Sequence, residues 1–520
     1  MMSLLFPKNT KSKYTSTEAH QGEHSISNLT GYQEKSISNR QSLNHLHRIA
    51  KLGLCLWLGL QTIVTCDATA QIAQSNLSPD PPTSRADRPY RVQAELSLKG
   101  NLHLPENALI SKKLAIRIPI QSTARFGYVE QRIDSTDATL SSQHGSIRLY
   151  DQASATTTVH EREHQVSLRE GTGGIAVISK NNQDLFFANQ SVLSREELDL
   201  LKLPVSSARL DALLPSQLAN LVEGDAFTVD ASALATAFRL TSVNFSSVKG
   251  EITSFEKETT KMRLEGEFTG NADQTATKIE LIANLNYSQR HQTCTWLAIG
   301  IREEREISIA EPGFEIAATL TIHRTPTSPL DLPASSSSID NSYEQPPPEK
   351  LLIEQQSDHL NFKTLTNRSW YMLTDAPGIA TMRQIEDEQV ISQCDFRTPP
   401  RLAVGKMHSP EDFQNEIVQK LGEQLTSLGD IEVEDRPSGL QVLRVTADGE
   451  AQGIPIRWVF LHFGDQSGRR LIATFTMEAG MSDRFSDSDR QIASSLRFLG
   501  HPSAKNRDSS GQKTKNAEAR

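Results

Sequence analysis

Apolar and polar residues alternate with a period of two along much of the chain between residues 90 and 325. A strand with this pattern presents one apolar face and one polar face. Examples are Val92, Ala94, Leu96 and Leu98; Ile279, Leu281, Ala283 and Leu285; and Phe314, Ile316, Ala318 and Leu320. So many segments with the same period predict a large antiparallel sheet.

A helical pattern interrupts these strands at Ser194-Arg-Glu-Glu197. A serine three residues before a glutamate has the spacing of a capping box, and leucines follow it up to residue 203. We therefore expect residues 90–325 to form one β-rich domain, in which a large curved antiparallel sheet or half-barrel is closed by one or two helices. This shape can hold an apolar ligand, or it can be a packed core and nothing more.

Residues 350–500 mix strand and helix signals. Ser409-Pro-Glu-Asp predicts a helix start, with serine as cap, proline at the first helical position and acids in the first turn. Its apolar stripe continues through Leu425 and Leu428, and Gly429 is expected to end it. A last helix is expected after Ser486, with Phe498 on its apolar face. Strands are expected between these helices at 440–445, 454–463 and 471–477.

This order of elements, over residues 362–499, resembles the PsbP-like fold of photosystem extrinsic proteins and of many bacterial exported proteins. The resemblance rests on the helix from Ser409, on Gly453–Phe460 paired with Arg470–Met477, and on Ser494–Phe498. It implies an α+β fold class, with a PsbP-like α/β sandwich as the second domain. It also implies a non-catalytic accessory or binding role, and no photosystem partner is carried over.

The whole chain also resembles bacterial exported proteins with a β-rich N-terminal domain. The segments Ser194–Leu203, Thr277–Leu281 and Thr295–Leu297 carry this second resemblance. No function is implied by it.

The first 70 residues have the pattern of a leader and signal peptide. Arg48 and Lys51 precede the apolar run 52–64, which is too short to span a bilayer as a helix, and Ala68-Thr-Ala70 is a small-residue cleavage site. Cleavage after Ala70 predicts an exported protein, periplasmic or extracellular. Lipidation at Cys66 and an uncleaved signal anchor are the alternatives, and either would hold the protein at the membrane.

Composition marks the remaining boundaries. Residues 71–89 and the Pro/Ser-rich stretch 326–349 are predicted linkers, and the polar residues 501–520 are a predicted disordered tail. The chain has 54 Lys and Arg against 63 Asp and Glu, without a basic stripe, which argues against nucleic-acid binding. Outside the leader only Cys294 and Cys394 remain. They are expected to be buried inert thiols, with a bridge between the domains as the alternative.

One motif matches the sequence pattern of a catalytic metal site. His160-Glu-Arg-Glu-His164 has the H-E-x-x-H spacing of zinc peptidases, in which two histidines one helical turn apart bind the metal and the glutamate polarises water. The preceding residues 153–159 alternate like a strand and are rich in β-branched side chains. In a strand, His160 and His164 would share a face with Arg162, as in a solvated hairpin.

The chain shows no G-x-S-x-G, P-loop or dinucleotide fingerprint. We therefore assign no catalytic, cofactor-binding or metal-ligating residue, with His160 and His164 as the weak metal candidates. The sequence predicts an exported, non-enzymatic binding or accessory protein, whose partner in the cell envelope is a protein or an apolar ligand. The first alternative is a carrier that binds a lipid or another apolar ligand in the curved sheet. The second is a zinc metallopeptidase that uses His160-Glu-Arg-Glu-His164.

Overall fold

The structure, a computed structural model, describes residues 89–104, 116–133, 144–172, 174–180, 183–272, 275–308, 311–327, 346–387 and 389–500. The predicted signal peptide, its cleavage site at Ala70 and Cys66 lie outside the described residues. So do the tail 501–520 and most of both predicted linkers.

Thirteen strands of the described residues form one antiparallel sheet. They are β1 (Tyr90–Leu104), β2 (Ile116–Ile133), β3 (His144–Val159), β4 (Arg162–Ser167), β5 (Ile175–Lys180), β6 (Gln183–Ala188), β8 (Ala226–Thr228), β9 (Ser242–Ser246), β10 (Lys249–Glu256), β11 (Thr259–Ala272), β12 (Thr275–Ser288), β13 (Thr293–Arg305) and β14 (Gly313–Pro326). Their order is β6-β5-β3-β2-β1-β14-β13-β12-β11-β10-β8, with β4 beside β3 and β9 beside β11.

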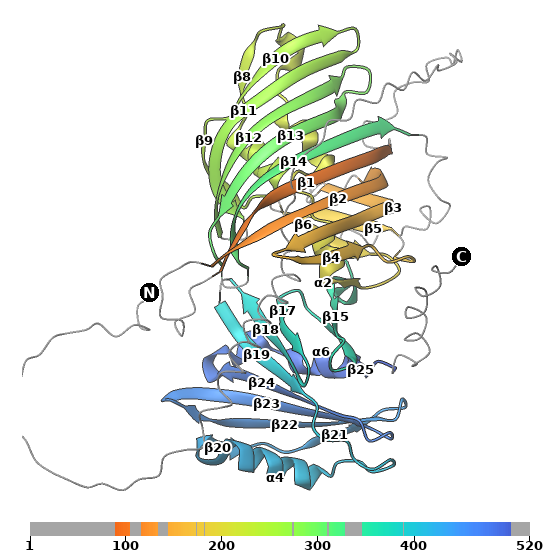
Figure 1. Cartoon of the computed structure of the whole chain (residues 1–520), viewed down its shortest axis with the longest axis vertical. Coiled ribbons are helices and arrows are strands. Elements are labelled where there is room, and N and C mark those ends of the chain that lie inside the picture. Colours follow the sequence, from red (N-terminus) through yellow and green to blue (C-terminus); the bar gives the residue numbers. More distant parts are fainter. Residues whose placement is uncertain are drawn as a thin grey trace, which may run out of the picture. The chain divides into compact units, whose positions relative to one another are not determined.

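The first and last strands of this sheet are neighbours in its middle (Figure 1). Leu98 of β1 lies opposite Ala318 of β14 and opposite Ser122 of β2. Gly100 allows a close approach in this pair, because a Cβ there would lie 2.2 Å from the carbonyl oxygen of Glu315. The pairing joins the strands before and after the helical interlude into one continuous sheet.

The inner, apolar face of this sheet is covered by residues 200–240, called here the covering segment. Its helical elements are the 3-10 turns η3 (Ser207–Leu213) and η4 (Leu218–Asn220) and the helix α3 (Ala231–Phe238), and the short helix α2 (Arg195–Leu200) precedes it. Leu210, Leu234 and Phe238 share one buried core with residues of β1, β2 and β11–β14. This core explains the period-two pattern, since the alternate side chains of the long strands need an apolar partner.

Four aromatic side chains test whether the inner face is filled. Phe126, Tyr128, Phe186 and Phe268 are all buried. The Tyr128 hydroxyl donates to Ser207 Oγ at 2.8 Å, and the Phe268 ring lies 5.1 Å from that of Phe238. At these positions the protein's own side chains fill the inner face.

Residues 346–500 contribute most of two smaller sheets. A four-stranded sheet has the order β25 (Arg497–Phe498), β16 (Phe362–Thr366), β15 (Ile353–Ser357) and β7 (Leu193–Ser194). An eight-stranded sheet has the order β17 (Trp370–Ala376), β18 (Ile379–Glu386), β19 (Gln389–Arg397), β24 (Arg470–Glu478), β23 (Ile454–Asp465), β22 (Leu440–Ala451) and β20 (Leu425–Leu428), with β21 (Glu432–Asp435) beside β22. The helices of residues 346–500 are α4 (Pro410–Leu421), α5 (Ser482–Phe485) and α6 (Ser488–Ser495). The 3-10 turns η8 (Pro348–Leu351), η9 (Gly422–Gln424) and η10 (Ala479–Met481) complete the described elements.

The predicted α+β class with a PsbP-like α/β sandwich is wrong. The described chain is built mainly of antiparallel sheets, and its α-helices span only four to twelve residues. Part of the reason is local. Gly422, at φ 52°, ends α4 early, so Leu425 and Leu428 enter β20 instead of extending the predicted helix. Phe498, also predicted to be helical, lies in the strand β25 and pairs with Phe362 of β16.

Of the three predicted helix starts, those at Ser194 and Ser409 are confirmed, whereas α6 begins at Ser488 without a side-chain cap from Ser486. Ser194 and Glu197 form the capping box of α2, and Ser409 Oγ accepts a hydrogen bond from the Asp412 amide at 3.0 Å, with Pro410 at the first helical position. None of the helices in the described residues is both long and apolar enough to cross a membrane.

The inner core should dominate the stability of the large sheet. Phe268 and Phe245 lie on the neighbouring strands β11 and β9, but Phe268 is fully buried whereas Phe245 is 54% exposed. We expect Phe268→Ala to lower the free energy of unfolding by about 3–5 kcal/mol, because it leaves a cavity. Phe245→Ala should change it by no more than about 0.5 kcal/mol. Denaturant titration of the full chain measures both values, and equal losses would contradict the assignment of the inner face.

Candidate functional site

A cleft of about 430 Å³, lined mostly by polar and charged residues, opens beside the start of α2. Residues of β4, α2, β15 and β17 line it, together with Glu311, and it is called here the α2 cleft. The lining residues are Gln165, Val166, Ser167, Arg169, Ser194, Arg195, Glu196, Glu197, Asp199, Glu311, Glu354, Gln355, Gln356, Asp358, Tyr371 and Met372. Its volume lies in the range of ligand sites, and such sites form preferentially where separate structural elements meet.

Glu197 anchors one wall of the cleft. As the third residue of the capping box, it accepts from the Ser194 amide at 2.8 Å, and it also accepts from Arg169 Nε at 2.8 Å and from the Arg169 amide at 3.0 Å. Burial alone would raise the pKa of Glu197, but the hydrogen bonds from Arg169 and Ser194 outweigh burial and lower that pKa. Glu197 therefore remains a fixed carboxylate at neutral pH.

Arg169 connects this wall to the opposite one. Its Nη1 donates to Glu354 of β15 at 3.1 Å, and its Nη2 donates to the Val192 carbonyl at 2.8 Å. Lys363 holds Glu354 from the other side, at 2.9 Å. Because β7 and β15 also pair in parallel, the two walls are joined through backbone and side chains.

Arg195 forms a stacked cation at the cleft. Its guanidinium carbon lies 4.4 Å from the centroid of the Tyr371 ring, and its Nη2 donates to the carbonyls of Trp370, at 3.0 Å, and Arg368. Burial raises the pKa of Tyr371, and Arg195 acts in the opposite direction. The phenol therefore stays neutral and works as a π surface.

The cleft carries an excess of negative charge. Six carboxylates line it against two guanidiniums, and Lys202 and Lys363, outside the lining, pair with two of the six, which leaves two formal negative charges in excess. Beyond the contacts of Glu197 and Glu354, Asp199 pairs with Lys202, and Glu196 lies 3.6 Å from His164 Nε2. Such a cleft favours positively charged groups.

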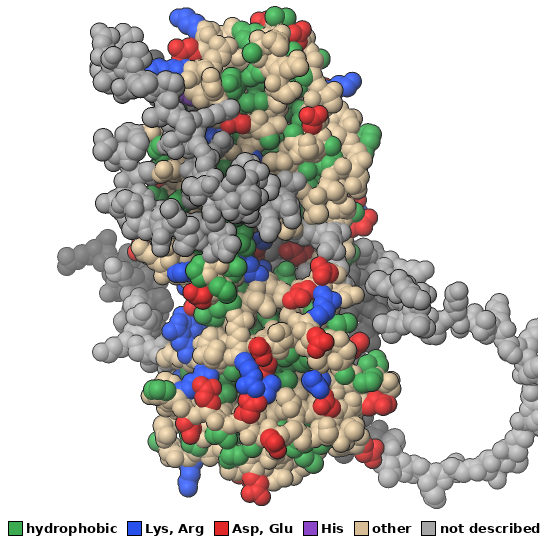
Figure 2. All heavy atoms as spheres, turned by 180° about the vertical axis from the view of Figure 1, so that it is seen from behind, with side chains coloured by type: hydrophobic (Ala, Val, Ile, Leu, Met, Phe, Trp, Pro, Cys, Tyr) green, Lys and Arg blue, Asp and Glu red, His purple; other side chains and the backbone are tan. Residues whose placement is uncertain are grey.

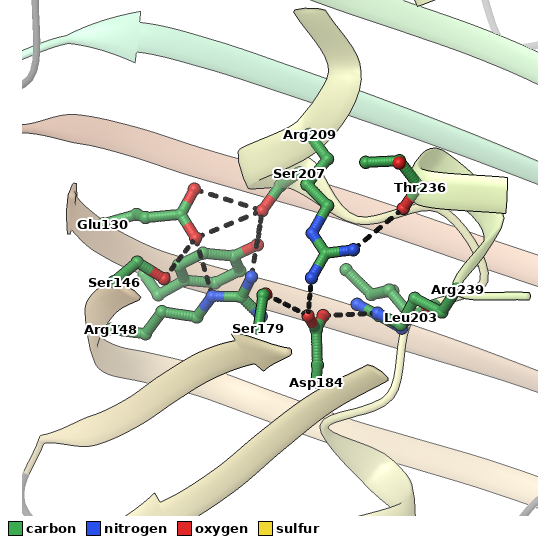
Figure 3. A network of polar contacts seen from close by, with 11 residues as sticks. Glu130, Ser146, Arg148, Ser179, Asp184, Leu203, Ser207, Arg209, Thr236 and Arg239 are labelled. Carbon is green, nitrogen blue, oxygen red and sulfur yellow. Dashed lines mark hydrogen bonds and ion pairs between the residues drawn. The ribbon is translucent and has the colours of Figure 1, made fainter. Parts of the chain in front are cut away.

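A second constellation lies buried between the sheet and the covering segment (Figure 3). It is called here the arginine network and comprises Glu130, Ser146, Arg148, Ser179, Asp184, Ser207, Arg209 and Arg239. The side chains come from β2, β3, β5 and β6 of the sheet, and from η3 and the residue after α3 in the covering segment.

Two ion-pair groups form the arginine network. Arg148 Nε donates to Glu130 Oε1 at 2.7 Å, and Ser207 Oγ donates to Glu130 Oε2 at 3.2 Å. Asp184 accepts from Arg209 Nη2 at 2.8 Å and from Arg239 Nε. Burial would raise the pKa of Asp184, but the charges of Arg239 and Arg209 outweigh burial and lower it. The network thereby ties the covering segment to the sheet.

The predicted metal candidates do not form a zinc site. His160 lies exposed in the turn between β3 and β4, with φ 58°, and His164 lies in β4 beside Glu196. The motif is therefore a hairpin, in which the two histidines are not one helical turn apart. Among the described residues no group of three or more His, Cys, Asp or Glu side chains is arranged to hold a metal ion.

The two described cysteines are free and buried. Burial raises the pKa of both thiols, and the Cys294 amide donates to Asp211 Oδ1 at 2.7 Å. Raised thiol pKa values are typical of inert cysteines. His291, the histidine nearest to Cys294 in sequence, donates its amide to Ser288 Oγ at 3.3 Å.

On the face drawn in Figure 2, basic and acidic side chains lie intermingled over the part of the chain that holds β17–β24. Ion pairs in this part of the chain include Arg436 with Glu434 and Arg457 with Asp448. The described residues of this face therefore form no segregated basic patch of the kind that tracks a phosphate backbone.

Comparisons with known proteins add little to this geometry. No protein-family model matches the chain, and a search of curated proteins finds no match. Among solved structures, lipovitellin is 5% identical over 46% of this chain, with a TM-score of 0.25, and the chain spans only 25% of its length. The outer membrane protein OprD from Pseudomonas aeruginosa is 8% identical over 75% of this chain and 93% of its own, with a TM-score of 0.11. TM-scores this low do not establish a common fold.

A buried histidine pair lies in the second part of the chain. The rings of His408 and His462 lie 4.9 Å apart, and Arg470 Nε donates to His462 Nε2 at 2.9 Å. Burial first, then the charges of Arg470 and His408, lower the pKa of His462 to about 3. His462 is therefore neutral in the folded protein and acts as a hydrogen-bond acceptor.

We expect this histidine to make the protein sensitive to acid. Below the ordinary histidine pKa of 6.5 the unfolded chain binds a proton that folded His462 does not bind until about pH 3. The contribution of His462 to stability is thus complete above pH 6.5 and is lost progressively towards pH 3, by at most about 1.4 kcal/mol per pH unit. Denaturant titrations at pH 7.5, 6, 5.5 and 5 should show this slope in the wild type. His462→Gln should flatten it, since glutamine can still accept from Arg470.

His160→Asn is the matched control, because His160 is exposed and asparagine tolerates its positive φ. This variant should keep the slope of the wild type. An unchanged slope in His462→Gln would refute the assignment to His462.

Proposed function

We propose that this protein is an exported, non-catalytic binding protein, and that the α2 cleft recognises a positively charged group of its partner. The observation that carries the proposal is the cleft itself, with about 430 Å³ of volume and two excess negative charges. Export is the expectation from the leader pattern of residues 1–70, which ends at Ala70.

The rigid framework of the cleft supports recognition. Glu197 and Glu354 are both held by Arg169, so a ligand does not have to order these side chains on binding. A site that is organised in advance loses less entropy when it binds. The pair of β7 with β15 fixes the distance between the walls in the same way.

The protonation state of the cleft supports a non-catalytic role. A general base works best with a pKa near the operating pH, whereas the pKa of Glu197 is lowered by its hydrogen bonds. Arg169 is occupied by Glu197, Glu354 and the Val192 carbonyl. These groups serve better as fixed charges than as proton carriers.

Lysine and arginine side chains are the chemistry that fits. An extended polypeptide segment with such residues could place one cation against Glu196 and Asp358, and could rest its aliphatic part on Tyr371 or Met372. The partner proposed is therefore a basic segment of another envelope protein.

Binding of a tetralysine peptide to the full chain tests this proposal. We expect binding at low salt that weakens as salt rises, with tetraglutamate not binding. The double variant Glu196→Gln, Asp358→Asn should bind about tenfold more weakly, since it removes the two excess charges. Isothermal titration calorimetry measures the affinities.

Glu251→Gln removes an exposed carboxylate on β10, away from the cleft, and serves as the control. It should bind tetralysine like the wild type. Equal affinities of the double variant and the wild type would rule out the α2 cleft as the binding site.

A second candidate is the carrier of an apolar ligand. The observation that favours it is the covering segment, which spans the apolar inner face with short helical elements and is tied to the sheet by polar groups. Phe126, Tyr128, Phe186 and Phe268 already fill part of this face, so a carrier would need the covering segment to move.

Native mass spectrometry of the full chain, purified from its own cell envelope, decides between the two. A bare polypeptide mass is expected for a binding protein that recognises basic segments. A co-purified lipid at one molecule per chain would establish the carrier instead.

A further inference from the structure

The arginine network contains more positive than negative charge. Arg148 pairs with Glu130, and Arg209 and Arg239 both pair with Asp184. Three guanidiniums thus share two carboxylates, which leaves one formal positive charge in excess. The neighbouring phenols do not supply the missing anion, because burial raises the pKa of both Tyr128 and Tyr150.

This excess charge is shielded from water. The side chains of Arg148, Arg209 and Arg239 are 0%, 8% and 12% exposed. The ring of Phe186 lies 5.7 Å from the guanidinium carbons of both Arg148 and Arg239, so its π face offsets part of the charge. A buried ion without a full counter-charge is strongly unfavourable, so an additional anion would stabilise this region.

Two donors of the network are left over. Arg148 Nη1 and Arg239 Nη2 are buried, and among the described residues neither has an acceptor in hydrogen-bond geometry, although the Tyr150 hydroxyl also contacts the Arg148 guanidinium. Figure 3 shows the guanidiniums of Arg209 and Arg239 joined to Asp184, and that of Arg148 joined to Glu130 and Ser207. Buried N–H groups of a charged side chain are rarely left unpaired, and here two of them accompany one unbalanced charge.

We infer that the arginine network is a receptor for one monovalent carboxylate, held by Arg148 Nη1 and Arg239 Nη2. A carboxylate fits because its single charge equals the excess and its two oxygens can accept from the two donors. The carboxylate can come from a small free acid or from the head group of a long-chain fatty acid. This site lies under the covering segment, and the inference does not rest on the α2 cleft.

Equilibrium dialysis of the full chain against radiolabelled acetate and radiolabelled palmitate tests the inference. Methanesulfonate keeps the ionic strength constant. We expect saturable binding at one carboxylate per chain. If acetate binds and competes with palmitate, the site takes free carboxylates; if palmitate alone binds, the site takes the head of an amphiphile. Binding of neither would overturn the inference and assign the two donors to ordered water.

Variants at Arg239 and Asp184 distinguish an effect of charge on carboxylate binding from an effect on folding. Arg239→Gln removes the excess charge and should weaken carboxylate binding about tenfold or more. Arg239→Lys keeps the charge and should retain most of the binding. Asp184→Asn raises the excess to two and should tighten binding, which a merely structural role would not do. Circular dichroism shows which variants fold, and Arg436→Gln, at a surface ion pair with Glu434, is the control.

If Arg239→Gln folds and binds carboxylate as tightly as the wild type, the assignment is wrong. If neither Arg239→Gln nor Asp184→Asn folds, the stoichiometry measured on the wild type still decides the question.

Discussion

Long antiparallel strands with one apolar face need a cover, and most features of this protein follow from how that cover is supplied. The covering segment follows α2, packs Leu210, Leu234 and Phe238 on the inner face, contributes the edge strand β8, and leads into β9. The hydrophobic contribution is non-directional, so it does not by itself fix where such a segment lies. The arginine network adds directional contacts, since Ser207 of η3 donates to Glu130, and Arg209 of η3 and Arg239 at the end of α3 donate to Asp184.

The two polar constellations use the same residue types in different solvent. In the α2 cleft the Arg169 side chain is 46% exposed, so solvent screens its charge. Its ion pairs therefore fix the geometry of the cleft more than they stabilise the fold. In the arginine network Arg148 is fully buried, so each charge has to be balanced inside the protein. The first environment suits exchange with partners in solution. The second suits ion pairs that hold the covering segment in place, or a tightly bound counter-ion.

The sequence predicts the strands of the large sheet because their period of two is strong and long. It also predicts the helix starts at Ser194 and Ser409, since these caps are local signals that need no tertiary information. It does not predict where α4 ends. Leu425 and Leu428 fit a helical stripe, and only their pairing with β22 decides against it. The mistaken α+β class arose in part from this ambiguity between periods.

Neither candidate site could be predicted from sequence, for two different reasons. In β3 the polar Ser146 and Arg148 are buried and the apolar Ile147 and Leu149 are only half-buried, because Glu130 of β2 and Ser207 of the covering segment supply polar partners on the inner face. The α2 cleft joins Arg169 to Glu354, which are 185 residues apart. No pattern within one segment reveals such a contact. The capping box gave the one usable signal, since it fixed Glu197 at the start of α2.

The neighbouring position of β1 and β14 has a consequence for how the chain folds. Residues 90–104 meet their partners at 313–326 only after everything between them has been made, so the sheet has high contact order and should form slowly. Until β14 arrives, β1 has an open edge of unpaired amides and carbonyls, which is a template for association with other chains. If the chain is exported as the leader pattern predicts, it would cross the membrane unfolded and then need protection of that edge on the far side. A chain cut short before residue 313 should aggregate, whereas one lacking only the residues after 326 keeps the closing strand.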